Sequence, residues 1–560
     1  MDYRQQIADL LSPYLPKEEA LQLLTPPKDV ALGDICLPCF RLAKTMRKSP
    51  VAIAEQLAAE IERPDYVAEI KAVAGYLNFK YASHAFARDV VGKVLQDGAA
   101  YGRSDMGGGR KVCVDYSSIN IAKPFHIGHL STTVLGAALC RLYDALGYQS
   151  VGINHLGDWG TQFGKLIVAF KRWSDEDEIR SGGVRKLVDI YVRFHREAEE
   201  DPSLDEEARG WFKRLEEGDA EAYRLWQWFK EITLADDLPV YERLGVHFDS
   251  LAGESFYNDK MQAVIDLLAE QGLLADSQGA KVVELEGMPP CIIVKSDGAT
   301  LYATRDLAAA LYRHQTYDFA KCLYVVAYQQ NLHFKQVFGV LQKMGYAWAA
   351  DLQHVAFGMV SLEEGAMSTR KGNAVWLTDV IDRAVAKAGE IIAEKSPDLA
   401  NPAEVAEMVG VGSVIFSALQ NNRIKDIEFK YDKLLNFDGE TCPYVQYTHA
   451  RCLSVLAKAA NADLTIADYG SLVDDTAKDI VRALDRYPSL LVDAADKNEP
   501  SMITRHVLDV CKLYNKYYFD NKILSADPGV REARLALTRA VATLVENGMG
   551  ILGIRLPDKM

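Results

Sequence analysis

The stretch IAKPFHIGHLSTT (residues 121–133) places two histidines, His126 and His129, one helical turn apart, with Gly128 between them. If a helix begins here, its N-terminus offers unpaired N–H groups and a partial positive charge, both of which suit a phosphate. Gly128 removes a side chain where a nucleotide would approach closely, and imidazoles can donate hydrogen bonds to phosphate oxygens. The alternative is that one histidine caps the helix and the other packs in the core.

The flanks of this stretch predict the surrounding fold. KVCVDY (111–116) is short, β-branched and alternating, which predicts a strand. Apolar residues recur at helical spacing over 130–146, and GYQSVGIN (147–154) predicts a second strand. Strand, turn, helix and strand in this order form the unit of a parallel nucleotide-binding sheet.

Composition predicts a soluble, multidomain protein. A chain of 560 residues exceeds one core and predicts three or four domains. The start is a charged amphipathic helix and not a secretory signal, and no uncharged apolar run approaches the ~20 residues of a membrane span. Nine scattered cysteines favour a reduced, cytoplasmic location. The single C-x-x-C pair, Cys36 and Cys39, favours packing over metal or redox chemistry, and we expect no structural metal.

The net charge of −15 is unevenly distributed. Residues 174–270 hold 25 acidic and 12 basic residues, a net charge of −13, so the remainder of the chain sums to only −2. The remainder can still present basic patches to phosphates. Charge therefore neither requires nor excludes an RNA partner.

Strand-like runs alternate with helices from 111 to about 380: VCVDY, SVGIN, CIIVK, CLYVVAY and HVAFGMV. The acidic block interrupts this alternation and is too long for a crossover, which indicates an inserted helical segment. Beyond about 380 the periodicity is almost entirely helical. The predicted divisions are an N-terminal α+β domain (1–105), an α/β domain (106–380) with a helical insertion (about 174–270), a helical region (381–435) and a C-terminal all-α bundle (436–560).

A second polar segment follows a late strand. HVAFGMVSLEEGAMSTRKGNAV (354–375) combines short hydroxyls, two cations and a glycine, which suit a loop that clamps a triphosphate. An ordinary solvated turn is the alternative. Because a phosphate-type turn after an early strand is now paired with another after a late strand, the two together resemble the HIGH and KMSKS signatures of class I aminoacyl-tRNA synthetases.

Five ordered segments narrow the resemblance to the arginyl-tRNA synthetase family. They are VDYSSINIAKPFHIGH (114–129), YATRDLAAA (302–310), VVAYQQNLHF (325–334), GMVSLEEGAMSTRKGN (358–373) and CPYVQYTHAR (442–451). The resemblance as a whole covers essentially the entire chain, including its N-terminal domain. The resemblance implies a Rossmann-like catalytic domain, an N-terminal domain that contacts the tRNA elbow, a stem-contacting region at 381–435 and an anticodon-binding C-terminal bundle.

An arginine substrate presents five N–H donors, so its pocket needs fixed acceptors. Asp115, at the end of the first strand, and Asp306, beside Tyr302, are the predicted acceptors. The alternative for Asp115 is an exposed carboxylate at a strand end, the alternative for Asp306 is a helix N-cap, and the alternative for Tyr302 is a core aromatic. The resemblance implies that the amino and carboxyl groups of arginine are held by Ser118, Asn120, His129 and Gln330, with Gln330 favoured over the adjacent Gln329.

The resemblance implies an ATP site made of His126, Gly128, His129, Gly157, Asp158, Met367, Ser368, Arg370 and Lys371. Gly157 and Asp158 follow the second strand and suit the adenosine or ribose, although the glycine could simply permit close packing. The loop pattern K-M-S-K-S reads A-M-S-T-R here, so both lysines are absent. Lys123, in the first turn, is the expected surrogate; Arg370 and Lys371 compete for this role, and a solvated loop cation is the remaining alternative. The catalytic set is then His126, His129, Lys123 and Lys371.

The resemblance implies activation of L-arginine by ATP with Mg²⁺, held largely by phosphates and water, and transfer to the terminal adenosine of tRNA(Arg), in this class to the 2′-hydroxyl. It also implies that activation requires bound tRNA. We expect a cytoplasmic monomer without a membrane partner. A small nucleotidyltransferase needs neither this length nor the second loop, and a non-catalytic RNA-binding paralogue predicts lost histidines.

Overall fold

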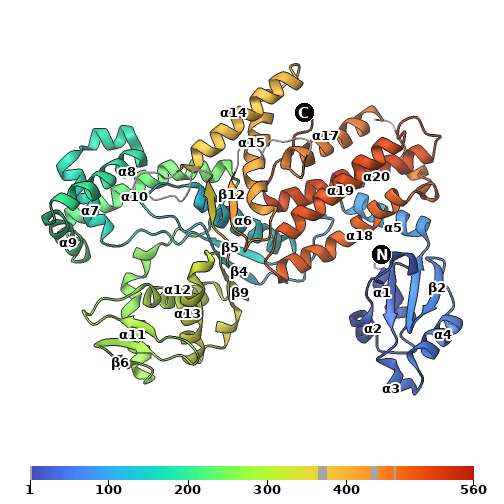
Figure 1. Ribbon diagram of the computed structural model, residues 1–560, viewed down its shortest axis with the longest axis horizontal. Helices are drawn as coiled ribbons and strands as arrows, with labels where there is room; N and C mark the ends of the chain where they lie inside the picture. The colour runs from blue at the N-terminus through green and yellow to red at the C-terminus, as the bar shows by residue number, and fades with distance from the viewer. Residues whose placement is uncertain (1–2, 363–374, 430–438, 460–461) are drawn as a thin grey trace.

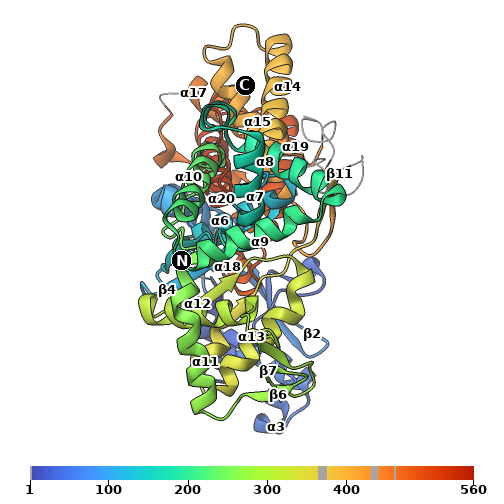
Figure 2. The same cartoon turned by 90° about the vertical axis from the view of Figure 1, so that its left-hand side faces the viewer.

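The computed structural model describes residues 3–362, 375–429, 439–459 and 462–560. A parallel sheet lies at the centre, with a helical insertion and a second small lobe on one side and a helical bundle on the other (Figure 1). The N-terminal domain lies beyond the bundle, at the opposite end of the molecule from the insertion. Seen end-on, the insertion lies above the small lobe (Figure 2).

The central sheet has four parallel strands in the order β10-β9-β4-β5. Its elements are β4 (Lys111–Asp115), η3 (Ile127–His129), α6 (Leu130–Ala145), β5 (Gln149–Ile153), β9 (Lys321–Tyr324), η5 (Tyr328–Gln330), α13 (Asn331–Lys343), η6 (Ala347–Asp351) and β10 (Leu352–His354). The strand, helix and strand predicted over 111–154 are confirmed. The chain passes from β4 to β5 on one side and returns to β9 on the other, so the strand order reverses at β4. Ligands of open parallel sheets bind at such a reversal, beyond the carboxyl ends of the strands.

One predicted strand lies outside this sheet and another is interrupted. CIIVK forms β8 (Cys291–Val294), which pairs in a separate antiparallel sheet. Of HVAFGMV (354–360), His354 ends β10, Val355 N donates to Tyr324 O at 2.8 Å, and Phe357 forms an isolated parallel bridge with Ala327. The chain then pairs as β11 (Val360–Leu362) with β12 (Ile427–Phe429), outside the central sheet. The apolar run therefore indicates burial but not one continuous strand.

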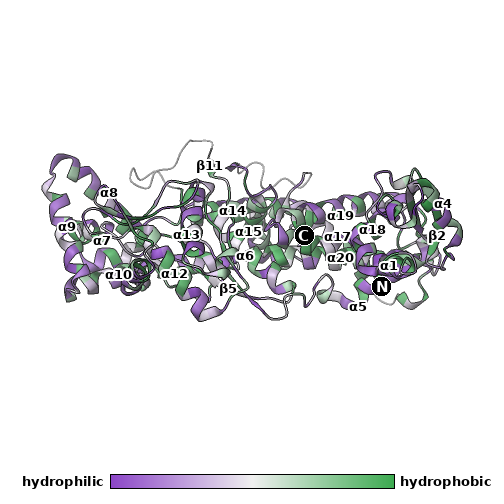
Figure 3. Cartoon of the chain, turned by 90° about the horizontal axis from the view of Figure 1, so that it is seen from below, coloured by the Kyte–Doolittle hydropathy of each residue, from purple (hydrophilic) through white to green (hydrophobic). Residues whose placement is uncertain are grey.

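The acidic block does not form one body. Its first part belongs to a helical insertion composed of α7 (Gln162–Trp173), α8 (Glu176–Glu200), α9 (Ser203–Glu216) and α10 (Ala220–Arg243). Its last part belongs to the small lobe, which contains η4 (Glu254–Lys260), α11 (Met261–Glu270), β6 (Ala275–Ser277), β7 (Ala280–Val283), β8 and α12 (Tyr302–Tyr317). The hydrophobic core of this lobe is continuous with residues of the central sheet and of α13. Hydrophilic residues cover much of α8 and α9 (Figure 3), so the excess carboxylates are largely solvated.

Beyond residue 376 the described chain is almost entirely helical, as predicted, with β12 as the exception. It comprises α14 (Leu377–Lys395), α15 (Pro402–Leu419), α17 (Cys442–Lys458), η8 (Leu464–Ile466), η9 (Tyr469–Ser471), α18 (Asp475–Asp496), α19 (Ser501–Asp520) and α20 (Val530–Leu552). By length and composition α15 and α20 could cross a membrane, but 61% and 78% of their apolar windows are buried inside the protein, as in core helices.

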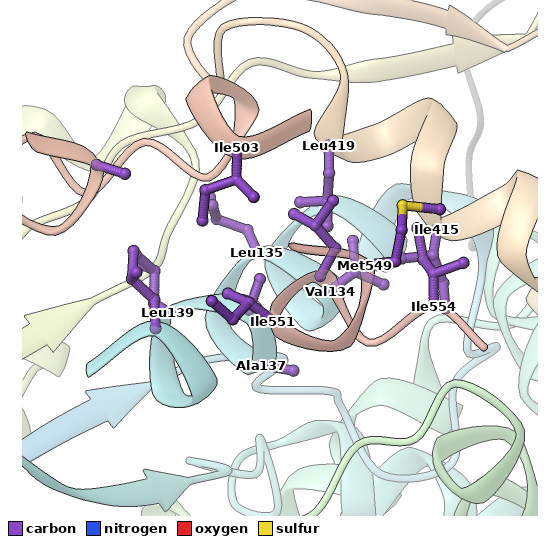
Figure 4. Packing of buried hydrophobic residues seen from close by; sticks show 14 of the residues in the cluster. Val134, Leu135, Ala137, Leu139, Ile415, Leu419, Ile503, Met549, Ile551 and Ile554 are labelled. Atoms are coloured by element: carbon purple, nitrogen blue, oxygen red, sulfur yellow. The ribbon is translucent and has the colours of Figure 1, made fainter. Parts of the chain in front are cut away.

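Helix α6 of the catalytic domain shares its core with this bundle. Apolar side chains of α6 pack against α15, α19, α20 and the residues after α20 (Figure 4); the labelled residues are Val134, Leu135, Ala137, Leu139, Ile415, Leu419, Ile503, Met549, Ile551 and Ile554. The helix that begins at the histidine turn is therefore anchored by residues more than 250 positions away in the sequence.

The N-terminal domain is α+β, as predicted. Its antiparallel sheet has the order β1-β3-β2, and its elements are α1 (Tyr3–Leu10), α2 (Lys17–Leu23), η1 (Val30–Leu32), β1 (Ile35–Pro38), α3 (Leu42–Met46), α4 (Pro50–Glu60), β2 (Val67–Val73), β3 (Tyr76–Tyr81), α5 (Ser83–Asp97) and η2 (Gly98–Ala100). Asp34 pairs with Arg482 of α18 at 2.9 Å, which ties this domain to the bundle. Cys36 and Cys39 are free and buried.

Candidate active site

The turn between β4 and η3 has an unusual backbone. Ser117, Ser118 and Ala122 adopt positive φ angles of 70°, 48° and 56°. Each such conformation costs a non-glycine residue on the order of 1 kcal/mol and persists only where surrounding contacts impose it. One such contact comes from Thr132 in α6, whose hydroxyl accepts from Ser117 N at 3.1 Å and donates to Val325 O at 2.7 Å. The turn is thus fixed to the end of β9.

The two histidines cap the start of the helix with their Nδ1 atoms. His126 Nδ1 accepts from Gly128 N at 3.1 Å, and His129 Nδ1 accepts from His126 N at 3.2 Å. Their rings stack, with centroids 3.9 Å apart. Burial lowers the pKa of both imidazoles, and for His129 the neighbouring His126 and the charge of Lys123 lower it further. Both rings are therefore neutral near pH 7, with the proton on Nε2.

This arrangement reconciles the two interpretations of the sequence. Both histidines cap, yet capping through Nδ1 makes Nε2–H the donor of each ring. A neutral N–H donor can bind a phosphate oxygen without the cost of burying a cation. Capping through Nδ1 therefore leaves the Nε2–H group of each ring able to donate to a phosphate oxygen.

The segment after the second signature pairs with the first. Ile127 N donates to Val375 O at 3.0 Å, and Leu377 N donates to Phe125 O at 2.9 Å, on either side of an antiparallel bridge between His126 and Trp376. The segment that follows the second signature thus lies against the first signature, although about 250 residues separate them in the sequence. Met367, Ser368, Arg370 and Lys371 themselves lie outside the described residues.

Asp115 already has a guanidinium partner within the chain. Its Oδ2 lies 2.8 Å from Arg313 Nη1, and its Oδ1 accepts from Ser118 Oγ at 3.0 Å. Arg313 also contacts His155 Nδ1 through Nη2, at 3.1 Å. Burial alone would lower the pKa of Arg313, but Asp115 raises it well above its usual value, so the guanidinium stays charged. Asp115 is buried, which excludes the exposed strand end.

Asp306 lies on α12 and faces His333 of α13. His333 Nε2 is 2.5 Å from Asp306 Oδ2. Burial raises the pKa of Asp306, but the hydrogen bond and charge of His333, with the charges of His155 and Arg313, hold it below its usual value. The N-cap of α12 is Leu301, so the N-cap alternative for Asp306 is wrong. Tyr302 is 68% exposed, which excludes a core aromatic.

A cavity of about 1130 Å³ opens beside Tyr302. Lys123 also lines it, as do Glu254, Asn258 and Arg305. Burial raises the pKa of Glu254 to about 7, against the opposing charge of Arg305, whose Nη1 lies 3.7 Å from its Oε2. A half-buried carboxylate with this shift is stabilised by an incoming cation.

The remaining predicted residues lie at the strand ends or near the turn. Gly157 is required by a close approach: a Cβ there would lie 2.4 Å from Asn120 Oδ1. Gln330 is exposed at the start of α13, as is Gln329. Asp158 has no exposed surface, and its carboxylate binds Lys230 Nζ at 2.6 Å and both Ser255 N and Oγ at 2.8 Å. Because these contacts occupy the carboxylate, we leave Asp158 out of the site proposed below.

Sequence reasoning missed Glu254, Arg305 and Arg313. Glu254 is one carboxylate among 25 in the acidic block and carries no local signal. Arg313 follows Asp306 by two helical turns, a spacing that places both on one face of α12 and could have identified it. Among the described residues, His, Cys, Asp and Glu form no group of three that could hold a metal.

Comparison with known proteins covers the whole chain. Residues 90–431 match the family model "tRNA synthetases class I (R), catalytic domain", 1–81 match "Arginyl tRNA synthetase N terminal domain" and 445–560 match "DALR anticodon binding domain". The chain is 50% identical to the arginine–tRNA ligase of Clostridioides difficile (98% of this chain, 97% of that protein) and 48% identical to that of Alkaliphilus metalliredigens (100% of both). The structure of the Thermus thermophilus arginyl-tRNA synthetase aligns over 100% of both chains, with a TM-score of 0.83 and 26% identity.

Proposed function

The chain belongs to the class I arginyl-tRNA synthetases, and from this premise we propose that it binds ATP at the His126 turn and arginine beside Tyr302. It is an arginine–tRNA ligase, which uses ATP to join arginine to tRNA. The observation that carries the site proposal is the pair of neutral, Nδ1-capped imidazoles where the strand order reverses.

The arginine pocket combines two carboxylates of different kinds. Asp306 is ionised and held by His333. Glu254, which lines the cavity with Tyr302, has a pKa of about 7 and is therefore partly protonated near neutral pH. A guanidinium between them gains charge-assisted hydrogen bonds from both. Asp115 contributes indirectly, because Arg313 neutralises it and links it to His155. We propose that Ser118, Asn120, His129 and Gln330 hold the amino and carboxyl groups of arginine.

The phosphates of ATP lie, in this proposal, at Gly128 and the Nε2 atoms of the two histidines, with Lys123 at the departing end. Gly157 supports this site by allowing Asn120 to approach. Mg²⁺, when bound with ATP, neutralises phosphate charge, held mainly by phosphates and water. Met367, Ser368, Arg370 and Lys371 complete the site from the second signature.

The reaction proceeds in two steps without a covalent enzyme intermediate. The arginine carboxylate attacks the α-phosphorus and pyrophosphate leaves, which gives arginyl-adenylate. A hydroxyl of the terminal ribose of tRNA then attacks the arginyl carbonyl carbon, and AMP leaves with the bonding electrons. The protein supplies placement and donors for the phosphate charge that develops. Exchange of labelled pyrophosphate into ATP, dependent on arginine and stimulated by tRNA(Arg), tests this proposal: loss in His126→Ala supports the site, and full exchange contradicts it.

We expect arginine binding to weaken below neutral pH. Arginine binds the ionised form of Glu254, whose pKa of about 7 means that the free enzyme carries a proton there at lower pH. Because that proton must be lost before arginine binds, the KM for arginine should rise as the pH falls below about 7, and the rise should approach tenfold for each pH unit. Well above pH 7 the KM should be constant. Steady-state kinetics across this range in the parent and in Glu254→Gln measure the effect. A slope that survives in Glu254→Gln would assign the titration to another group.

The anticodon end of the tRNA has a matching cavity in the bundle. About 1400 Å³ opens beside Tyr447, Arg451, Tyr518 and Phe519. The Arg451 guanidinium lies 4.9 Å from the Tyr447 ring and 5.0 Å from the Tyr518 ring, while Phe519 is 89% exposed. Exposed aromatics beside a cation are the usual platform for unpaired bases. We propose that anticodon bases stack here.

Phe519→Ala should raise the KM for tRNA(Arg). Stacking of one base is worth about 1–3 kcal/mol by alanine substitution, which predicts a roughly 5- to 160-fold increase. Because Phe519 is so exposed, the melting temperature should not change. Aminoacylation kinetics measure the effect, and Leu524→Ala, an exposed apolar residue lining the same cavity, is the comparison for non-specific loss. An unchanged KM for tRNA(Arg) in Phe519→Ala would show that anticodon bases do not stack on Phe519.

We further propose that the enzyme is a cytoplasmic monomer. The support is compositional: scattered free cysteines, eight of nine buried, suit a reducing compartment. Sedimentation equilibrium tests the monomer.

A further inference from the structure

Helix α10 of the acidic insertion carries one face of side chains that all contact the catalytic domain. Trp226, Lys230, Thr233 and Tyr241 are separated by four, three and eight positions, which places them on a single face of the helix. Every one of them makes a hydrogen bond to one of the two loops that follow the central strands. The insertion is therefore fastened to the active site through this face.

The loop after β5 is held by the first half of the face. Trp226 Nε1 donates to the backbone oxygen of Asp158 at 2.7 Å, and Lys230 Nζ donates to its carboxylate at 2.6 Å. This explains why a carboxylate at the strand end is fully buried. It also fixes Gly157, the preceding residue, against Asn120.

The turn after β4 is held by the second half. Thr233 Oγ1 accepts from Ala122 N at 3.1 Å and donates to Phe229 O within α10 at 2.8 Å. The Tyr241 hydroxyl shares a hydrogen bond with Ser117 Oγ at 2.7 Å and accepts from Asn154 Nδ2 at 3.2 Å. Ser117 and Ala122 are two of the three residues with left-handed backbone in this turn.

We infer that Thr233 and Tyr241 are positioning residues for the activation of arginine. Thr233 fixes the peptide at Ala122, immediately before Lys123, and Tyr241 fixes the start of the same turn. Without these bonds the turn can relax from its left-handed conformations, and Lys123 and His126 lose their common placement. Neither side chain touches substrate in this inference, which rests on the ATP site proposed above.

Thr233→Val keeps the shape of the side chain and removes both of its hydrogen bonds. We expect kcat for tRNA-stimulated pyrophosphate exchange to fall about tenfold while the KM for arginine stays within about twofold, because misplacement of the turn affects the reacting phosphates and not the guanidinium pocket. Thr233→Ser should restore most of the rate. Tyr241→Phe, which removes one oxygen, should lower kcat in the same way.

Thr504→Val is the matched control for lost stability. Thr504 is also buried, and its hydroxyl donates to Leu419 O at 3.0 Å across two helices of the bundle. It should lower the melting temperature while leaving kcat unchanged. Unchanged kcat in both Thr233→Val and Tyr241→Phe overturns the inference, as does a loss in Thr233→Val that Thr504→Val reproduces. His126→Ala in the same assay separates the two proposals: if it keeps full exchange, the ATP site itself is misassigned.

Discussion

We expect Asp306→Asn to raise the KM for arginine about 100-fold while the KM for ATP stays within about twofold. Asp306 is ionised and only partly exposed, so the substitution removes a charge-assisted bond to the guanidinium, worth about 2.7 kcal/mol at this fold-change. The volume of the side chain is unchanged, which limits rearrangement around His333. Initial-rate measurements with each substrate varied in turn separate the two constants.

Specificity provides a second measurement on the same variant. Citrulline has the shape of arginine without its charge. The parent should reject it because Asp306 and Glu254 would then lack the guanidinium that they bind in arginine. In Asp306→Asn the ratio of kcat/KM for arginine to kcat/KM for citrulline should be smaller than in the parent. Asp318→Asn, at the exposed C-terminal end of the same helix, is the matched control and should behave as the parent. An unchanged arginine KM in Asp306→Asn would remove Asp306 from the pocket.

Lys123→Ala should lower kcat about 100-fold or more. Its charge lies near both His129 and Glu254, where it would meet the departing pyrophosphate. An interaction made only in the transition state lowers kcat and kcat/KM together, and deletion of one preorganised donor has this scale. The KM for arginine should barely change. Single-turnover formation of arginyl-adenylate measures the step directly.

Rescue from a distant position is the sharper test of Lys123. Thr369 stands where the common loop pattern has a lysine. Adding Thr369→Lys to Lys123→Ala should recover part of the lost rate, which a purely structural Lys123 could not explain. Lys111→Ala, at the other end of β4, is the control for loss of a neighbouring positive charge. If Lys123→Ala is nearly as active as the parent, Arg370 or Lys371 becomes the leading phosphate ligand.

Local sequence is sufficient for the part of the site that is built locally. The turn from Asp115 to His129 lies between one strand and one helix, so the order of residues along the chain is also their order around the turn. The places of the two signatures after an early and a late strand predict that they lie together, and the bridge between His126 and Trp376 places the segment after the second signature beside the first.

The rest depends on contacts between distant segments. The partnership of Asp115 with Arg313 requires α12 to pack beside β4, and nothing near Asp115 signals it. Thr233 and Tyr241 look like ordinary helix residues until the insertion is folded back on the turn. The strand predicted after His354 is interrupted for the same reason: an apolar run indicates that residues are buried but not with which strand they pair.

The core shared by α6 and the bundle imposes an order on biosynthesis. Translation reaches the end of α6 at residue 145, but α20, which covers its apolar face, begins at residue 530. At about 5–20 residues per second the ribosome needs roughly 20–80 s to cross that interval. Throughout it the nascent catalytic domain lacks the part of this covering surface that α20 supplies, so apolar side chains of α6 such as Val134 and Leu135 are incompletely buried until synthesis is nearly finished. The active-site helix reaches its final packing only when synthesis is nearly complete.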